Sequence, residues 1–205
     1  MDNPVAAPVI DVDIREKRFG DTPVLGEVRF SLTVGQTLAI SGPSGVGKST
    51  LLRIVAGIDH DFAGQVRGAS STAMVFQEPV LLPWRSALAN ITLATRVPPA
   101  LAAAGLEEVG LGDLADRFPG QLSLGQQRRL ALARALAANP DLLLLDEPFV
   151  SLDPDLVEEM LSLTERLLSA RDVATILVTH TESEARRLAT RFARLSGAPA
   201  HLIEG

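Results

Sequence analysis

The chain has 205 residues, a size typical of one domain, and 46% of them are hydrophobic, which is enough to bury a sizeable core. The 19 basic and 25 acidic residues give a net charge of −6, which argues against a nucleic-acid partner because such proteins usually carry a basic surface. The absence of cysteine excludes disulfides and thiolate metal sites.

No part of the sequence predicts a membrane span. The densest apolar run, VPPALAAAGL, is broken by Pro98 and Pro99, whereas a spanning helix needs about 18 apolar residues. The start of the chain, MDNPVAAPV, has no basic residue and carries two prolines, so a signal peptide is not expected. Any membrane role is therefore expected to come through a partner.

The first third of the chain is predicted to be rich in strands. Residues 9–14 alternate apolar and polar, as in a half-buried strand, and residues 28–34 alternate again. Residues 37–41 and 73–76 are compact apolar runs that indicate buried strands. Between these runs, TLLRIVAG predicts a short helix that Gly57 can end.

From about residue 83 to residue 138 the pattern changes to helices, and Asn139-Pro140 ends the last of them. LLLLDE and ATILVTH then predict fully buried strands, as in a parallel sheet covered on both faces. Asp153-Pro154 between them is expected to begin a helix as N-cap and first residue. Thr181 and Glu184 predict a capping box for the next helix, and RFARL and HLI predict short final strands.

These elements predict an α/β fold with two lobes: buried parallel strands, a helical insertion and a more antiparallel N-terminal part. One domain is expected over residues 1–205, with a helical subdomain at about 83–138 inside it.

The segment GPSGVGKS fits the phosphate-binding loop G-x-x-x-x-G-K-[ST]. Its glycines let successive backbone N–H groups point at one phosphate, Lys48 supplies a positive charge, and Ser49 offers a hydroxyl to Mg²⁺. The strand before it and the helix after it disfavour the alternative of an ordinary glycine-rich turn. The candidate ATP-binding residues here are Gly42, Pro43, Ser44, Gly45, Val46, Gly47, Lys48, Ser49 and Thr50.

Polar residues close the predicted strands at the edge where ligands bind in α/β sheets. Asp146 suits Mg²⁺, whereas Glu147 is expected to point the opposite way along the strand and reach a water beyond the γ-phosphate. His180 can hydrogen-bond a γ-phosphate, and the Gln77 amide can ligate Mg²⁺. The alternatives are solvated carboxylates and a structural histidine.

The stretch LSLGQQ begins the last helix of the helical part. Ser123 and Gln126 form an S-x-x-Q capping box, which is the simpler interpretation. The same helix N-terminus can receive an anion, because its free N–H groups and its dipole favour one. The phosphate-binding motifs elsewhere in the chain favour this second interpretation.

Together these segments resemble the ATP-binding cassette (ABC) ATPases. The phosphate loop, a glutamine loop at Gln77, the signature LSLGQ, the acidic strand LLLLDE, the motif SLD and a switch histidine follow in the family's order over nearly the whole chain. The resemblance implies a P-loop NTPase (RecA-like) core with an N-terminal antiparallel β subdomain and an inserted α-helical subdomain. It also implies that two such domains sandwich two ATP molecules, with the phosphate loop of one facing the signature of the other.

The resemblance implies a role for each site residue. Glu147 polarises the attacking water, Asp146 and Ser49 hold Mg²⁺, and His180 and Gln77 sense the γ-phosphate. Phe19 would stack on adenine. Ser123, Gly125 and Gln126 would contact the ATP bound by the other domain, and Asp153 would lie in the dimer-communication loop.

The stretch FQEPVLLPWRSALANI looks like the cassettes of nitrate, sulfonate and taurine importers, and so does RLSGAPAHLI. The resemblance implies a subunit that powers solute uptake from the cytoplasmic face of the inner membrane. Its partners would be a membrane permease, a second copy of the chain and, indirectly, a solute-binding protein. Leu81, Leu82 and Trp84 would contact the permease; the alternative is that they pack inside the helical lobe.

The sequence also departs from the family. Leu124 replaces the usual signature glycine, the segment from Gly64 to Gln77 is short, and no regulatory C-terminal domain is expected. Competing functions are a soluble cassette protein of DNA repair or translation, a nucleotide-gated scaffold, and a kinase. A kinase is disfavoured because Glu147 would activate the water that a kinase must exclude. The transported solute cannot be read from the sequence.

Overall fold

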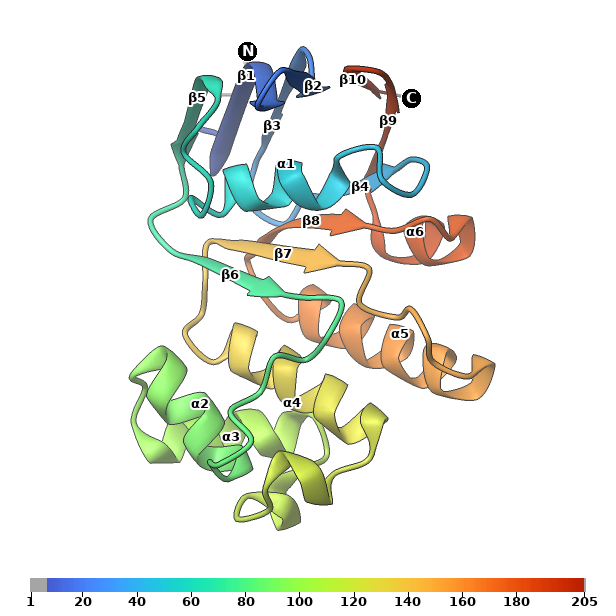
Figure 1. Ribbon diagram of the computed structural model, residues 1–205. Coiled ribbons are helices and arrows are strands. Elements are labelled where there is room, and N and C mark those ends of the chain that lie inside the picture. The colour runs from blue at the N-terminus through green and yellow to red at the C-terminus, as the bar shows by residue number, and fades with distance from the viewer. Residues whose placement is uncertain (1–6, 205) are drawn as a thin grey trace, which may run out of the picture.

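Figure 1 shows the computed structural model of the chain, which describes residues 7–204. Most of the segment considered above for a signal peptide lies outside the described residues. Within the described part, no helix is long and apolar enough to cross a bilayer.

Strands predominate up to residue 75, helices follow one another from residue 87 to 136, and strands and helices alternate from residue 142 to 197 (Figure 1). The strands are β1 (Ile10–Phe19), β2 (Thr22–Leu25), β3 (Val28–Leu32), β4 (Thr37–Ser41), β5 (Ala63–Gly68), β6 (Thr72–Val75), β7 (Leu142–Asp146), β8 (Ala174–Val178), β9 (Arg191–Gly197) and β10 (Ala200–Glu204). The helices are α1 (Lys48–Val55), α2 (Ala87–Thr95), α3 (Pro99–Glu108), α4 (Leu124–Leu136), α5 (Pro154–Ser169) and α6 (Glu182–Leu188), with short 3-10 helices η1 (Gly112–Leu114) and η2 (Pro119–Gln121).

The predicted α/β class and its elements are confirmed, and two short strands are added. The sequence patterns do not predict β2 or β5. Strand β5 reads AGQVRG and is largely exposed, so it carries no apolar alternation. It forms because it pairs with β1 along the whole segment from Ile10 to Glu16, and β2 pairs with the other end of β1.

The sheet runs in the order β3-β1-β2-β10-β9-β4-β8-β7-β6, with β5 beside β1. The segment β4-β8-β7-β6 is parallel, and β1 pairs antiparallel with β2, β3 and β5. Helix α1 lies on one side of the parallel strands and α4 and α5 on the other (Figure 1). Leu142 and Leu144 pack into the core on the α1 side of the sheet, and Leu143 and Leu145 pack into the core on the side of α4 and α5. Both faces of β7 are therefore buried, which explains its fully apolar sequence up to Asp146.

Of the predicted helix caps, that of α5 is confirmed, whereas the capping box predicted for α6 is wrong. Asp153 caps α5 as expected, since its Oδ1 accepts a hydrogen bond from the backbone N–H of Leu156 at 3.0 Å. Thr181 stands at the N-cap of α6, but its side chain makes no capping hydrogen bond. Glu184 instead accepts a hydrogen bond from Thr179 Oγ1. Both of these groups are buried, and a buried polar group needs a partner more than a solvated cap does.

Candidate functional site

The phosphate loop joins β4 to α1 and depends on its glycines. Gly42, Gly45 and Gly47 have φ values of 155°, 76° and 110°, which side chains rarely allow. A Cβ on Gly42 would lie 2.5 Å from the carbonyl oxygen of Leu195, and one on Gly47 would lie 2.8 Å from Leu25 Cδ2. The loop is therefore curled tightly against β9 and β2.

Lys48 lies inside this loop. Its side chain is only 5% exposed, and Nζ donates hydrogen bonds to the carbonyl oxygens of Gly42 and Pro43, both at 3.0 Å. Nζ also lies 3.4 Å from Glu147 Oε1. The loop thus holds a buried positive charge where its backbone curls, and such a charge suits a phosphate.

Ser49 and Asp146 meet across the sheet edge, with Ser49 Oγ donating to Asp146 Oδ1 at 3.2 Å. Burial raises the pKa of Asp146, and the hydrogen bond from Ser49 opposes that rise. Hydroxyl and carboxylate oxygens are ligands that Mg²⁺ takes, usually together with water and substrate phosphates. No cluster of three or more His, Asp or Glu able to hold a metal occurs in residues 7–204, so a cation here would depend on such additional ligands.

Glu147 does not continue the strand alternation expected from the sequence. Strand β7 ends at Asp146, and Glu147 turns away with φ of 46°. Its carboxylate lies between Lys48 and His180, with Oε2 3.5 Å from His180 Nδ1. The sharp turn therefore brings both neighbouring carboxylates to the phosphate loop, one beside Ser49 and one beside Lys48.

Gln77 reaches the same edge from β6, because Val75 pairs with Leu145 in the neighbouring strand β7. Gln77 is exposed, and its backbone carbonyl oxygen accepts a hydrogen bond from Arg128. No hydrogen bond joins its side chain to Ser49 or Asp146 in the described structure. The predicted magnesium ligands are thus brought together in part, as a close pair with Gln77 at the same edge.

The N-terminus of α4 forms the predicted capping box. Ser123 Oγ accepts from the Gln126 N–H at 3.2 Å, and Gln126 Oε1 accepts from the Ser123 N–H at 2.9 Å. Gly125 is buried, and a Cβ there would lie 2.7 Å from Leu156 Cδ1. The glycine is therefore required at least by the close packing of α4 on α5.

Leu124 lines a groove of about 600 Å³ together with Gln77, Val80, Leu81 and Ser151. Its side chain is exposed, at 44% of the residue's full area. Of the three residues expected to contact a permease, only Leu81 lines this groove, and the three differ in exposure. Leu81 packs against the helical core and Leu82 is half-buried, whereas Trp84 is 66% exposed.

Two residues that the sequence patterns did not single out hold the loop after β6. Arg128 is 5% exposed and donates to the carbonyl oxygens of Gln77 and Val150, so it ties α4 to two other loops. Asn90 is fully buried; its Oδ1 accepts from the Leu82 N–H at 2.7 Å. Arg128 lies four residues before the buried Leu132, on the same face of α4. A charged residue on the apolar face of a helix indicates a buried polar contact, and this signal could have identified Arg128 from the sequence.

Phe19 ends β1 in the hairpin with β2, and it is 55% exposed. The hairpin reaches the phosphate loop, because Gly47 lies against Val24 and Leu25 of β2. The exposed ring is therefore carried by the hairpin that packs on the loop.

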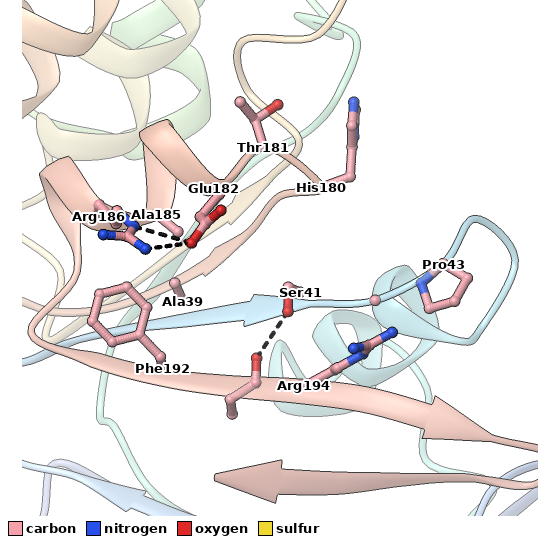
Figure 2. A pocket seen from close by; sticks show the side chains of 12 residues that line it. Ala39, Ser41, Pro43, His180, Thr181, Glu182, Ala185, Arg186, Phe192 and Arg194 are labelled. Carbon is pink, nitrogen blue, oxygen red and sulfur yellow. Dashed lines mark hydrogen bonds and ion pairs between the residues drawn. The ribbon is translucent and has the colours of Figure 1, made fainter. Parts of the chain in front are cut away.

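A pocket of about 960 Å³ lies next to the phosphate loop, between α6, β4 and β9 (Figure 2). Gly42, Pro43 and His180 line it, but Lys48, Ser49 and Asp146 do not. Figure 2 shows the imidazole of His180 pointing away from Phe192 and Ala39. The pocket thus adjoins the group of charged residues described above through His180, while Lys48, Glu147 and Asp146 lie outside its lining.

The phosphate loop before α1, the acidic end of β7 and the parallel sheet define a P-loop nucleotide-binding protein. The family model described as "ABC transporter" matches residues 25–150. An aliphatic sulfonates import ATP-binding protein, SsuB, of Mycobacterium sp. (strain MCS) is 47% identical over 94% of this chain and 81% of its own length. An SsuB 1 protein of Paracoccus denitrificans is 43% identical over 90% of this chain and 78% of its own.

Among solved structures, an ABC transporter of metal-chelate type in an inward-facing conformation superposes with a TM-score of 0.86 and 26% identity. It matches 97% of this chain and 84% of its own. The chain therefore belongs to the ABC transporter family, and it is an ATPase of that family.

Proposed function

We propose that this ATPase powers the uptake of aliphatic sulfonates through a separate membrane permease. The proposal is carried by the meeting of Lys48, Glu147 and His180 at one sheet edge, in a chain 47% identical to a sulfonate-import ATP-binding protein. The high identity extends over most of both chains, which supports a shared substrate class.

In this proposal Glu147 accepts a proton from the attacking water, or orients that water. Its carboxylate lies beside Lys48 and His180, whereas that of Asp146 accepts from Ser49, so the two acids can serve different tasks. Lys48 neutralises the β- and γ-phosphates, and His180 hydrogen-bonds the γ-phosphate. Ser49, Asp146 and Gln77 would hold Mg²⁺, which supplies charge neutralisation for the leaving group. Phe19 stacks on adenine, in keeping with its exposed ring.

Ser123, Gly125 and Gln126 would contact the ATP bound by a second copy of the chain, and Asp153 would take part in communication between the copies. The proposal treats the chain as one nucleotide-binding domain with a helical subdomain at about residues 83–138. In this proposal the chain lies on the cytoplasmic face of the inner membrane. A solute-binding protein acts on the chain only through the permease. Leu81, Leu82 and Trp84 belong to the permease contact, with Trp84 as the exposed anchor.

Growth on different sulfur sources tests the proposal. The gene is deleted in its own host, in a strain without other sulfonate importers, and cells receive an alkanesulfonate or sulfate. Growth should be lost on the alkanesulfonate and kept on sulfate, and the wild-type gene should restore it whereas Lys48→Ala should not. Full growth of the deleted strain on alkanesulfonates would overturn the sulfonate assignment; if the purified chain still hydrolysed ATP, a non-transport ATPase would be favoured.

A further inference from the structure

Lys17 is one of only two lysines in the chain, and the structure buries it beside the candidate nucleotide site. Its side chain is 2% exposed. Nζ lies 2.9 Å from Asp59 and donates to the carbonyl oxygen of Asp61 at 2.7 Å. Burial alone would lower the pKa of Lys17, but Asp59 and Asp61 raise it above the usual value, so the ammonium is charged.

The same ammonium lies over the ring of Phe19, 4.7 Å from the ring centroid. Lys17 and Phe19 are two residues apart near the end of β1, on either side of an irregularity in its pairing with β2. A cation at this distance is attracted to the face of an aromatic ring. One face of Phe19 is thus occupied by the lysine, while the ring remains 55% exposed.

Asp59 connects this arrangement to α1, the helix that follows the phosphate loop. Its backbone N–H donates to the carbonyl oxygen of Arg53, near the end of the helix that begins at Lys48. The contacts of Lys17 therefore fix the tip of the β1–β2 hairpin relative to α1. A ring held in this way does not have to be ordered when a base arrives, which lowers the entropic cost of binding.

We propose that Lys17 is a positioning residue for the nucleotide base: it holds Phe19 from one side so that the other face of the ring stacks on the base. This inference rests on the proposed function, in which Phe19 carries the stacking contact. Nζ of Lys17 contacts Asp59, Asp61 and the ring of Phe19, so its effect should be confined to ligands that have a base.

The test compares two ligands by isothermal titration calorimetry on the full chain: ATP, and inorganic tripolyphosphate, which lacks a base. Lys17→Met should weaken ATP binding by about three- to tenfold, the range of one cation–π contact, and leave tripolyphosphate binding unchanged. The kcat at saturating ATP should also be unchanged. Lys17→Arg, which keeps a cation over the ring, should restore most of the ATP affinity.

Arg29→Met is the matched control. Arg29 lies on the neighbouring strand β3 and forms ion pairs with Asp13 and Glu27, so the substitution removes a paired cation that does not contact an aromatic ring. It should change neither ligand's affinity. If Lys17→Met weakened both ligands equally, or weakened neither, the positioning role would be overturned. Thermal unfolding of each variant identifies any loss due to misfolding, and Asp59→Asn, which keeps Lys17 but loosens it, should then reproduce a smaller ATP-specific loss.

Phe19→Ala separates this inference from the proposed function. It should weaken ATP binding and spare tripolyphosphate, and adding Lys17→Met to it should cause no further loss. A silent Phe19→Ala variant would overturn the stacking role on which the inference rests. An ATP-specific loss in Phe19→Ala without any loss in Lys17→Met would overturn the role of Lys17 alone.

Discussion

At the phosphate-loop edge of the sheet, side chains from distant parts of the chain meet, whereas at the N-terminus of α4 the hydrogen bonds of the signature residues are local. Ser49 and Asp146 are separated by 97 residues in the sequence and share a hydrogen bond. Ser123 and Gln126 are three residues apart and satisfy each other. The first region depends on the tertiary fold, and the second would form in any helix with this sequence.

This difference indicates how the two regions can act. The edge gathers opposite charges, Lys48 with Glu147, that a bound phosphate and cation can rearrange. At the N-terminus of α4, Leu124 shares a groove with Gln77, but within residues 7–204 no hydrogen bond or ion pair joins Ser123 or Gln126 to Lys48, Glu147 or His180. The edge should therefore bind ATP in a single chain, whereas the signature should matter only when a second chain presents its nucleotide. Variants of the two regions should consequently differ in whether they change binding or turnover.

The largest expected effect is that of Glu147→Gln. Removing the carboxylate that can accept a proton from water should slow ATP hydrolysis by at least about a hundredfold, while ATP still binds. Steady-state turnover and calorimetric ATP binding measure the two effects. Glu182→Gln, which removes an exposed acid on α6, is the control. Turnover like that of the wild type in Glu147→Gln would show that the carboxylate is not the general base.

Trp84→Ala tests the loop after β6, where an exposed tryptophan follows the groove-lining residues Leu81 and Pro83. A large exposed aromatic residue at the centre of an interface contributes about 2 kcal/mol, so binding to the permease should weaken by about thirtyfold. ATP affinity should not change, because Trp84 makes no contact with the phosphate-loop edge in the described structure. Phe118→Ala, which removes another exposed ring, serves as the comparison. Equal co-purification of the permease with wild type and Trp84→Ala would remove Trp84 from the docking surface.

Ser123→Ala addresses the N-terminus of α4 directly. We expect kcat to fall by about tenfold with unchanged ATP affinity in the single chain, since the hydroxyl would meet only a second chain's phosphate. Ser86→Ala is a close control, because Ser86 caps α2 with the same kind of hydrogen bond and lies outside the candidate site. Both variants should lose about 1 kcal/mol of stability. If the kcat values of the two variants fell equally, the loss would be due to capping alone.

The sequence predicts the edge better than it predicts the loops around it, for a physical reason. Strands β4, β7 and β8 are apolar runs whose ends must coincide in a parallel sheet, so the apolar pattern alone assigns Asp146 and His180 to one edge. The turn at Glu147 depends on a positive φ that no periodicity reveals.

The loop from Gln77 to Trp84 is likewise set by contacts with residues outside the loop, one of them 51 residues away in the sequence. Its backbone is held by Arg128 and Asn90, and Leu81 faces inward while Trp84 faces outward. Such side-chain contacts follow from packing between helices, and the local sequence cannot specify them.

Leu124→Gly should have the smallest effect and gives the finest test of the comparison. The leucine is exposed at the first residue of α4, and neither hydrogen bond of the capping box uses its side chain. The kcat should therefore stay within about threefold of the wild-type value, with a stability loss of up to about 1 kcal/mol from the added glycine. Leu101→Gly, in the first turn of α3, controls for that loss because Leu101 is also exposed. A large gain in kcat, absent from Leu101→Gly, would mean that the leucine slows the meeting of the two chains, and the N-terminus of α4 would then be a rate-setting surface as well as a local cap.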